Sequence, residues 1–173
     1  MDKKKSVILL SVIAVLAVCL VAGFFYWDKL HNGATAESRE RVLQETKNGL
    51  TITAETEVNG YIVSSIYDTK HQQHGLAVFK PEGNGKYSLQ TRTLRSPDEI
   101  VNCLMMTDET TYHLFYCDEA NLDYAEITYT PAGKQPETFT LDVPESHIIS
   151  FEVPEKDYSL NVVFYDTEGN KYE

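Results

Sequence analysis

The stretch DYAEITYTP, residues 123–131, alternates apolar and polar side chains from one end to the other. In an extended chain, one side of it carries Ala125, Ile127 and Tyr129. The opposite side carries Glu126, Thr128 and Thr130. Alternation over about four to eight residues is typical of a β-strand with one face in a core and the other in water. The stretch therefore predicts a half-buried strand.

The same period of two recurs along most of the chain after Leu50. Nine further stretches show it with varying regularity: TITAETEV (51–58), GYIVSSIY (60–67), GLAVFKP (75–81), GKYSLQTRTL (85–94), EIVNCLMM (99–106), TYHLFYC (111–117), ETFTLDV (137–143), HIISFEVP (147–154) and DYSLNVVFYD (157–166). The segments between them are rich in Pro, Gly, Asn, Asp and Ser, which are typical of turns. About ten short strands separated by turns predict an all-β domain.

A sheet of half-buried strands must cover its apolar face, and a second sheet is the usual cover. We therefore predict a mainly antiparallel, two-layer β-sandwich over residues 50–173. A length of about 125 residues is ordinary for one domain. If the domain divides into two halves, residues 97–98 and 118–121 are the candidate boundaries.

Residues 6–27 form a run of 22 residues without a charged side chain, rich in Val, Leu, Ile and Ala. At about 1.5 Å of rise per residue, a helix of this length covers roughly 33 Å, and a hydrocarbon core is about 30 Å thick. Three lysines precede the run and four aromatic residues end it. Because lysine-rich ends stay in the cytoplasm, residues 1–5 are predicted to be a cytoplasmic tip. Residues 6–27 are predicted to be the transmembrane helix of a single-pass protein of the cell membrane, with its C-terminal domain extracellular.

A cleaved signal peptide is the alternative interpretation of the N-terminus. Ala34-Thr35-Ala36 matches an A-x-A cleavage pattern, and the protein would then be secreted after cleavage near Ala36. An apolar stretch of about 20 residues is longer than the usual 7 to 15 of a signal peptide. We therefore favour the permanent anchor.

Residues 28–49 are predicted to hold a polar linker and a short juxtamembrane helix. Thr35 is a suitable N-cap residue, and Asn48-Gly49 supplies a helix stop. The helical stretch ESRERVLQETKNG contains few apolar residues and no heptad repeat. A spacer or a lid on the β domain is therefore favoured over a coiled coil.

The chain carries 15 basic and 26 acidic residues. Without residues 2–5, the predicted extracellular part retains 12 basic and 25 acidic residues, a net charge of −13. Such a surface repels nucleic acid and anionic lipid headgroups, and it favours cations or basic partners. It also keeps a domain dispersed in water. We therefore expect no nucleic-acid partner.

Of three cysteines, Cys19 lies in the predicted span and Cys103 and Cys117 lie outside it. An extracellular compartment permits a disulfide between Cys103 and Cys117. It would close a loop of about fifteen residues and stabilise the fold by about 3 kcal/mol. However, a hairpin turning at residues 107–110 would place Cys103 opposite Leu114 instead. Two buried free thiols are the alternative.

His71 and His74 show the H-x-x-H spacing that metal sites use. They lie in a predicted loop, whereas a catalytic zinc needs a third ligand and a positioned acid. A metal-dependent enzyme using His71 and His74 is therefore the least favoured hypothesis. The motifs G-x-S-x-G, H-E-x-x-H and S-x-x-K are missing from the sequence, and we expect neither a catalytic activity nor a cofactor.

The segments GYIVSSIYD, GLAVFKPEGNGKY, LDYAEITYT and FYDTEGNKYE resemble uncharacterised small single-pass membrane proteins of Gram-positive bacteria. In those proteins a lysine-rich tip and one span precede a β-rich extracellular domain, and the resemblance implies this topology but no activity. We hypothesise a non-catalytic, membrane-tethered binding or accessory domain. Its partner would be a protein or cell-wall component, met at sheet edges or at loops such as residues 68–75. The alternative is a protective or inhibitory protein that captures a basic partner at the membrane surface.

Overall fold

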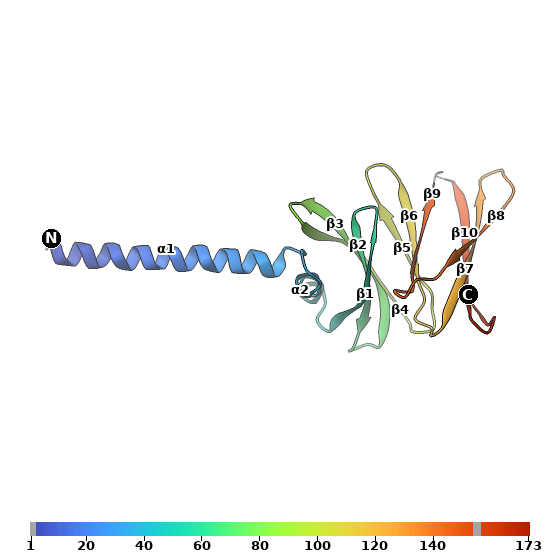
Figure 1. Cartoon of the computed structure of the whole chain (residues 1–173), viewed down its shortest axis with the longest axis horizontal. Coiled ribbons are helices and arrows are strands. Elements are labelled where there is room, and N and C mark those ends of the chain that lie inside the picture. The colour runs from blue at the N-terminus through green and yellow to red at the C-terminus, as the bar shows by residue number, and fades with distance from the viewer. Residues whose placement is uncertain (1–2, 154–156) are drawn as a thin grey trace.

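The computed structural model describes residues 3–153 and 157–173 of the chain, and the side chains of residues 12–28, 31–153 and 157–173. A long helix, α1 (Lys3–His31), stands clear of the rest of the molecule, and a short helix, α2 (Ala36–Thr46), follows it (Figure 1). Eleven strands come next, ten of which match the ten predicted stretches. The additional strand is β11 (Lys171–Tyr172), which is too short to show a periodic pattern.

The strands form three antiparallel sheets. The proximal sheet, beside α2, has the order β1 (Leu50–Val58), β2 (Tyr61–Asp68), β3 (Gln73–Gly83), β4 (Lys86–Arg95). The middle sheet has the order β5 (Val101–Met106), β6 (Thr111–Tyr116), β9 (Ile148–Val153). The distal sheet has the order β11, β10 (Tyr158–Asp166), β7 (Leu122–Pro131), β8 (Glu137–Asp142). Antiparallel pairing and an all-β domain are thus confirmed.

The sheets are stacked in three layers, where the sequence predicted two (Figure 1). At β6 and β9, the middle sheet is covered on both faces. Leu114 and Tyr116 pack against the proximal sheet, whereas Phe115 and Ile149 pack against the distal sheet. A strand covered on both sides reads as a continuous apolar run. The stretch LFYC, residues 114–117, is such a run, and this is why the alternation was weak there.

Helix α2 covers the outer face of the proximal sheet. Its Leu43 is fully buried in a core with Leu50, Ile66, Ala77 and Phe79. The predicted N-cap is confirmed, because the Thr35 hydroxyl accepts from the Ser38 amide at 3.2 Å and the Ser38 hydroxyl accepts from the Thr35 amide at 3.1 Å. This reciprocal pair satisfies two amides that the helix itself leaves without a partner. Of the two predicted roles, α2 has that of a lid.

The segment that joins α1 to α2 is fixed to β4. Lys86 Nζ lies 2.8 Å from both carboxylate oxygens of Asp28, and the Tyr87 amide donates to the Asn32 carbonyl at 2.8 Å. Gly33 has φ +67°, and a Cβ there would lie 2.2 Å from the Tyr87 carbonyl oxygen. The predicted linker is therefore held against β4, and only glycine fits at position 33.

Cys103 and Cys117 are both free, buried thiols, so the disulfide considered above is not formed. Cys103 packs in the core between the proximal and middle sheets, and it pairs with Leu114 across the β5–β6 hairpin. Cys117 packs in the core between the middle and distal sheets. Because the middle sheet separates the two thiols, the arrangement is the alternative of two buried thiols.

Among the described residues, no helix combines the length and the apolar character needed to cross a membrane. The transmembrane helix over residues 6–27 stays a prediction.

Candidate functional site

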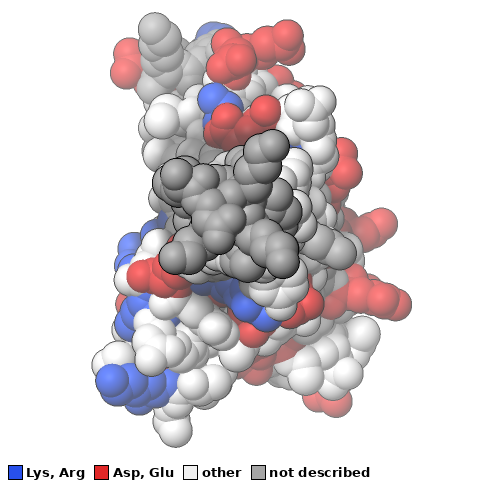
Figure 2. Space-filling view, turned by 90° about the vertical axis from the view of Figure 1, so that its left-hand side faces the viewer, with Lys and Arg blue, Asp and Glu red and all other residues white. Residues whose placement is uncertain are grey.

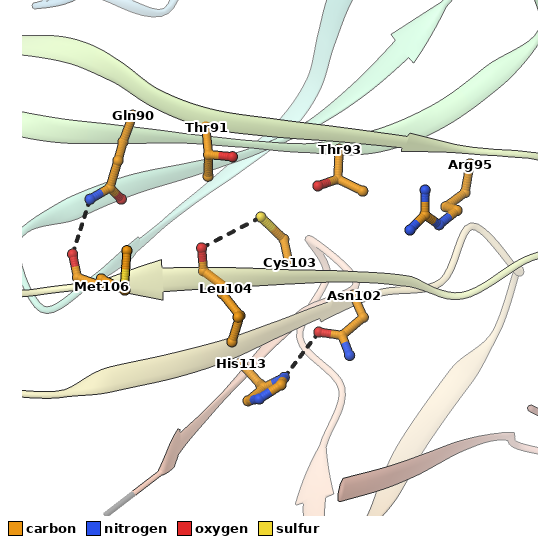
Figure 3. Close-up of a pocket in the computed structure, with 9 residues that line it drawn as sticks. All are labelled: Gln90, Thr91, Thr93, Arg95, Asn102, Cys103, Leu104, Met106 and His113. Carbon is orange, nitrogen blue, oxygen red and sulfur yellow. Dashed lines mark hydrogen bonds between the residues drawn. The ribbon is translucent and has the colours of Figure 1, made fainter. Parts of the chain in front are cut away.

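A groove of about 630 Å³ lies between β4, the edge strand of the proximal sheet, and β5, the edge strand of the middle sheet. We call it the β5 groove. Its lining residues are Gln90, Thr91, Thr93, Arg95, Asn102, Cys103, Leu104, Met106 and His113 (Figure 3). The two sheets are stacked face to face, and each of them ends here in an edge strand. The groove lies between these two edges.

The β4 side of the groove is polar. Gln90, Thr91, Thr93 and Arg95 follow one another along the strand and extend toward β5 (Figure 3). The Gln90 side-chain amide donates to the carbonyl of Met106 at 3.0 Å and links the two strands at one end of the groove. This side thus brings two hydroxyl groups and one guanidinium to the groove, and the hydroxyls of Thr91 and Thr93 already contact the Cys103 thiol.

The backbone of β5 presents donors and acceptors to the groove. The Thr107 amide donates to the Thr110 carbonyl at 2.9 Å, which makes residues 107 and 110 a hydrogen-bonded pair of the hairpin. In an antiparallel pair, hydrogen-bonded and non-hydrogen-bonded positions alternate. The peptide groups of Asn102, Leu104 and Met106 therefore point away from β6, toward the free edge. The bond from Gln90 to the Met106 carbonyl agrees with this assignment.

The same three positions carry exposed side chains. Leu104 is 50 % exposed and Met106 is 64 % exposed, while Val101, Cys103 and Met105 on the other face are buried. Within the described β domain, the only other large apolar side chain of comparable exposure is Phe139. The exposure arises because the distal sheet covers β6 and β9 but leaves this face of β5 open.

A hydrogen-bonded chain of side chains closes the back of the groove. His113 Nδ1 lies 3.0 Å from Asn102 Oδ1, and His113 Nε2 lies 2.6 Å from the Tyr158 hydroxyl. Both contacts are satisfied when Nδ1–H donates to Asn102 and the Tyr158 hydroxyl donates to Nε2. Burial lowers the pKa of His113, which favours this neutral form. The chain holds the Asn102 side chain in place beside the peptide edge of β5.

The one thiol in the groove is held in its neutral form. Burial raises the pKa of Cys103, because a buried thiolate would lose its hydration. The nucleophilic form of cysteine is the thiolate. The groove therefore has the chemistry of a binding surface, with peptide groups, hydroxyls and apolar side chains in reach of a ligand.

The structure separates the two histidines of the H-x-x-H pattern. His71 is exposed and its Nδ1 lies 2.8 Å from Asp68 Oδ2. His74 is 2 % exposed, and its Nε2 lies 2.7 Å from the Glu99 carbonyl oxygen. Within the residues that the structure describes, no group of three or more His, Cys, Asp or Glu side chains could hold a metal ion.

His71 instead belongs to a cluster around the buried carboxylate of Asp68. This carboxylate accepts from Lys47 Nζ at 2.5 Å, from His71 and from the backbone amides of Lys70 and His71. The bond from Lys47, with those from His71 and Lys70, holds the pKa of Asp68 well below its usual range. The cluster closes the turn between β2 and β3 and ties it to the end of α2.

Partners were expected at sheet edges from the sequence, but β5 was not identified as the edge. The signal was present in EIVNCLMM, where Leu104 and Met106 occupy the positions that a half-buried strand gives to polar residues. The contribution of β4 had no such signal, because the contact between Gln90 and Met106 depends on the stacking of two sheets.

Comparison with protein-family models, with curated proteins and with solved structures gave no significant match.

Proposed function

We propose that this protein is a non-catalytic binding or accessory domain, tethered to the outer face of the cell membrane, that holds a partner in the β5 groove. The observation that carries the proposal is the free edge of β5. It combines outward-pointing peptide groups with the exposed side chains of Leu104 and Met106. Exposed edge strands are sites of pairing with other chains unless they are protected.

Membrane tethering is supported by the N-terminal sequence. Residues 6–27 carry no charge, and three lysines precede them. In α1 the apolar side chains from Val12 to Trp27 are exposed, as expected of side chains that contact lipid. A helix with one span and an N-terminus in the cytoplasm would place the three hydrophobic cores and the β5 groove outside.

The contacts that join α1 to β4 support an accessory role. Asp28, Asn32 and Gly33 connect α1 to β4, which is also one wall of the β5 groove. A freely jointed domain would sample many orientations over the membrane. This domain would instead present the groove in a fixed direction relative to the span.

Capture of a basic partner is the second candidate, and the distribution of charge favours it. Residues 28–99 contain nine basic and ten acidic residues, whereas residues 100–173 contain three basic and fifteen acidic ones. Viewed from the α1 end, Lys and Arg side chains gather toward one side and Asp and Glu toward the other (Figure 2). The part of the chain that forms the middle and distal sheets, residues 100–173, therefore carries nearly all of the net negative charge.

Site-specific photo-crosslinking in the native cell tests the proposal. A photoreactive amino acid replaces Met106 in the full chain, and a matched variant carries it at Thr138, on the outward face of β8. We expect a discrete cross-linked partner from position 106 and none from position 138. No cross-link from position 106, or equal cross-links from both positions, would contradict a partner in the β5 groove.

A further inference from the structure

We infer that the β5 groove takes its partner by strand addition: an extended, basic segment of another protein pairs with the free edge of β5. This inference rests on the proposed function and adds the mode of recognition and the chemistry of the partner. Strand addition supplies affinity through main-chain hydrogen bonds and specificity through alternate side chains.

The peptide groups of β5 define the shape of the occupant. The amides and carbonyls of Asn102, Leu104 and Met106 project toward the groove at every second residue. Only a chain in extended conformation repeats its own donors and acceptors at this spacing. The Met106 carbonyl is already held at 3.0 Å by the Gln90 side chain. That amide stands where a donor of the added strand would lie.

The exposed side chains define alternate positions of the occupant. In a paired strand, directly opposite side chains on one face lie about 4.5 to 5.5 Å apart. Apolar residues at alternate positions of the added segment would therefore cover Leu104 and Met106, which are 50 % and 64 % exposed. The intervening side chains would face the polar wall of Thr91 and Thr93.

The charge of the sequence around β5 favours a basic segment as the partner and opposes a second copy of this chain. The lining of the groove itself carries the guanidinium of Arg95, so this preference comes from acidic residues beyond the lining. The part of the chain that contains β5, residues 100–173, carries three basic and fifteen acidic residues. Pairing two such halves edge to edge would oppose like charges. Asp108 and Glu109 lie at the hairpin tip, separated by one residue from the end of β5. A Lys or Arg of the added segment would be attracted to them at that end of the groove.

The test uses the full chain in lipid nanodiscs and a displayed library of random peptides of about nine residues, a common strand length. We expect enriched peptides with apolar residues at alternate positions and at least one Lys or Arg. Binding of such a peptide should slow hydrogen exchange of the Leu104 amide about tenfold or more. The amides of Cys103 and Met105, which face β6, should change little.

Three variants separate strand addition from simple surface contact. Leu104→Pro removes an outward amide that β6 does not use, and edge positions of this kind tolerate proline. It should weaken peptide binding about tenfold, whereas Leu104→Thr, which keeps the amide, should weaken it less. Gln90→Ala frees the Met106 carbonyl for the added strand. Gln90→Ala should leave peptide binding unchanged or tighten it. If the bond from Gln90 to Met106 only supported the structure, its loss would weaken binding.

Several outcomes would overturn the inference. They are enrichment of acidic peptides, unchanged exchange of the Leu104 amide in the complex, full binding by Leu104→Pro, or a dimer that forms through β5. If position 106 cross-links to a partner in cells but the Leu104 amide stays unprotected, strand addition fails and the proposed function stands. If position 106 yields no partner, the proposed function fails first.

Discussion

Two buried aspartates show how single residues close the hairpins of this fold. Asp68 is fully buried and accepts from the amides of Lys70 and His71, while Asp166 accepts from those of Glu168 and Asn170. The two aspartates lie in the similar segments IYDTK and FYDTE. The segments are alike because each forms a turn of the same kind. Several hydrogen-bond donors stabilise the charged form of each carboxylate. Protonation removes that charge and therefore weakens the turn.

Asp68 should therefore make the stability of the fold depend on pH in the acidic range. Its pKa in the folded protein lies below the unfolded reference of 3.8, so its contribution is fully present above that pH. The contribution is lost as pH falls from 3.8 toward the lower folded value. Asp68→Asn should lower the unfolding temperature at neutral pH and reduce the further loss between about pH 5 and about pH 2.

Thermal unfolding of the full chain across this pH range checks the prediction. Glu57→Gln, which neutralises an exposed carboxylate on β1, is the control and should follow the wild-type curve. Parallel curves for wild type and Asp68→Asn would show that Asp68 does not contribute in this way.

At the scale of elements, the joint between α1 and β4 depends on Gly33. A methyl group there would lie 2.2 Å from the Tyr87 carbonyl oxygen, and the two atoms can separate only if the backbone shifts. Gly33→Ala should therefore force the two segments apart and destabilise the joint by about 1–3 kcal/mol. The Tyr87 amide, which donates to Asn32, should exchange its hydrogen faster.

Gly60→Ala is a matched control for the joint. Gly60 also has a positive φ, +78°, but a Cβ there would meet nothing within 4 Å. It should cost only the backbone strain, about 1 kcal/mol, and leave the Tyr87 amide unchanged. Equal effects of the two substitutions on that amide would mean that the joint does not depend on the close approach at Gly33.

A strand was predictable from the sequence where one of its faces is exposed to water. A strand with both faces buried was harder to predict. The pattern in β7 identified the strand and its inward residues, Ala125, Ile127 and Tyr129, because water covers the other face. Strand β6 is buried from His113 to Tyr116, so its pattern could not reveal which sheet covers each face. The third layer was missed for this reason, and with it the groove that stacking creates beside β5.

At the scale of the whole molecule, the charges of the two ends agree with a tethered domain. The part next to α1 is nearly neutral, and the part farthest along the chain carries most of the negative charge. An acidic surface is repelled by anionic lipid. A domain so divided would stand with its acidic sheets away from the membrane, in a position to meet a basic partner.

The proposed topology predicts where the C-terminus lies. A tag placed after Glu173 should be accessible to protease in intact cells, because three N-terminal lysines favour a cytoplasmic location for the other end of a spanning segment. Replacing Lys3, Lys4 and Lys5 with Glu should reduce the accessible fraction. A tag that is protected in intact cells and cleaved only after lysis would contradict the topology.

The stacking of three sheets with β5 left open is the claim on which the groove, its function and its partner all depend. The most direct test compares the free energies of unfolding of Leu114→Ala, Phe115→Ala and Leu104→Ala in the full chain. Leu114 and Phe115 are 0 % and 2 % exposed in different cores, so both substitutions should cost about 2–5 kcal/mol, while Leu104→Ala should cost less than about 1 kcal/mol. A small cost at Phe115 would mean that no distal sheet covers the middle one, and a large cost at Leu104 would mean that the edge of β5 is not free.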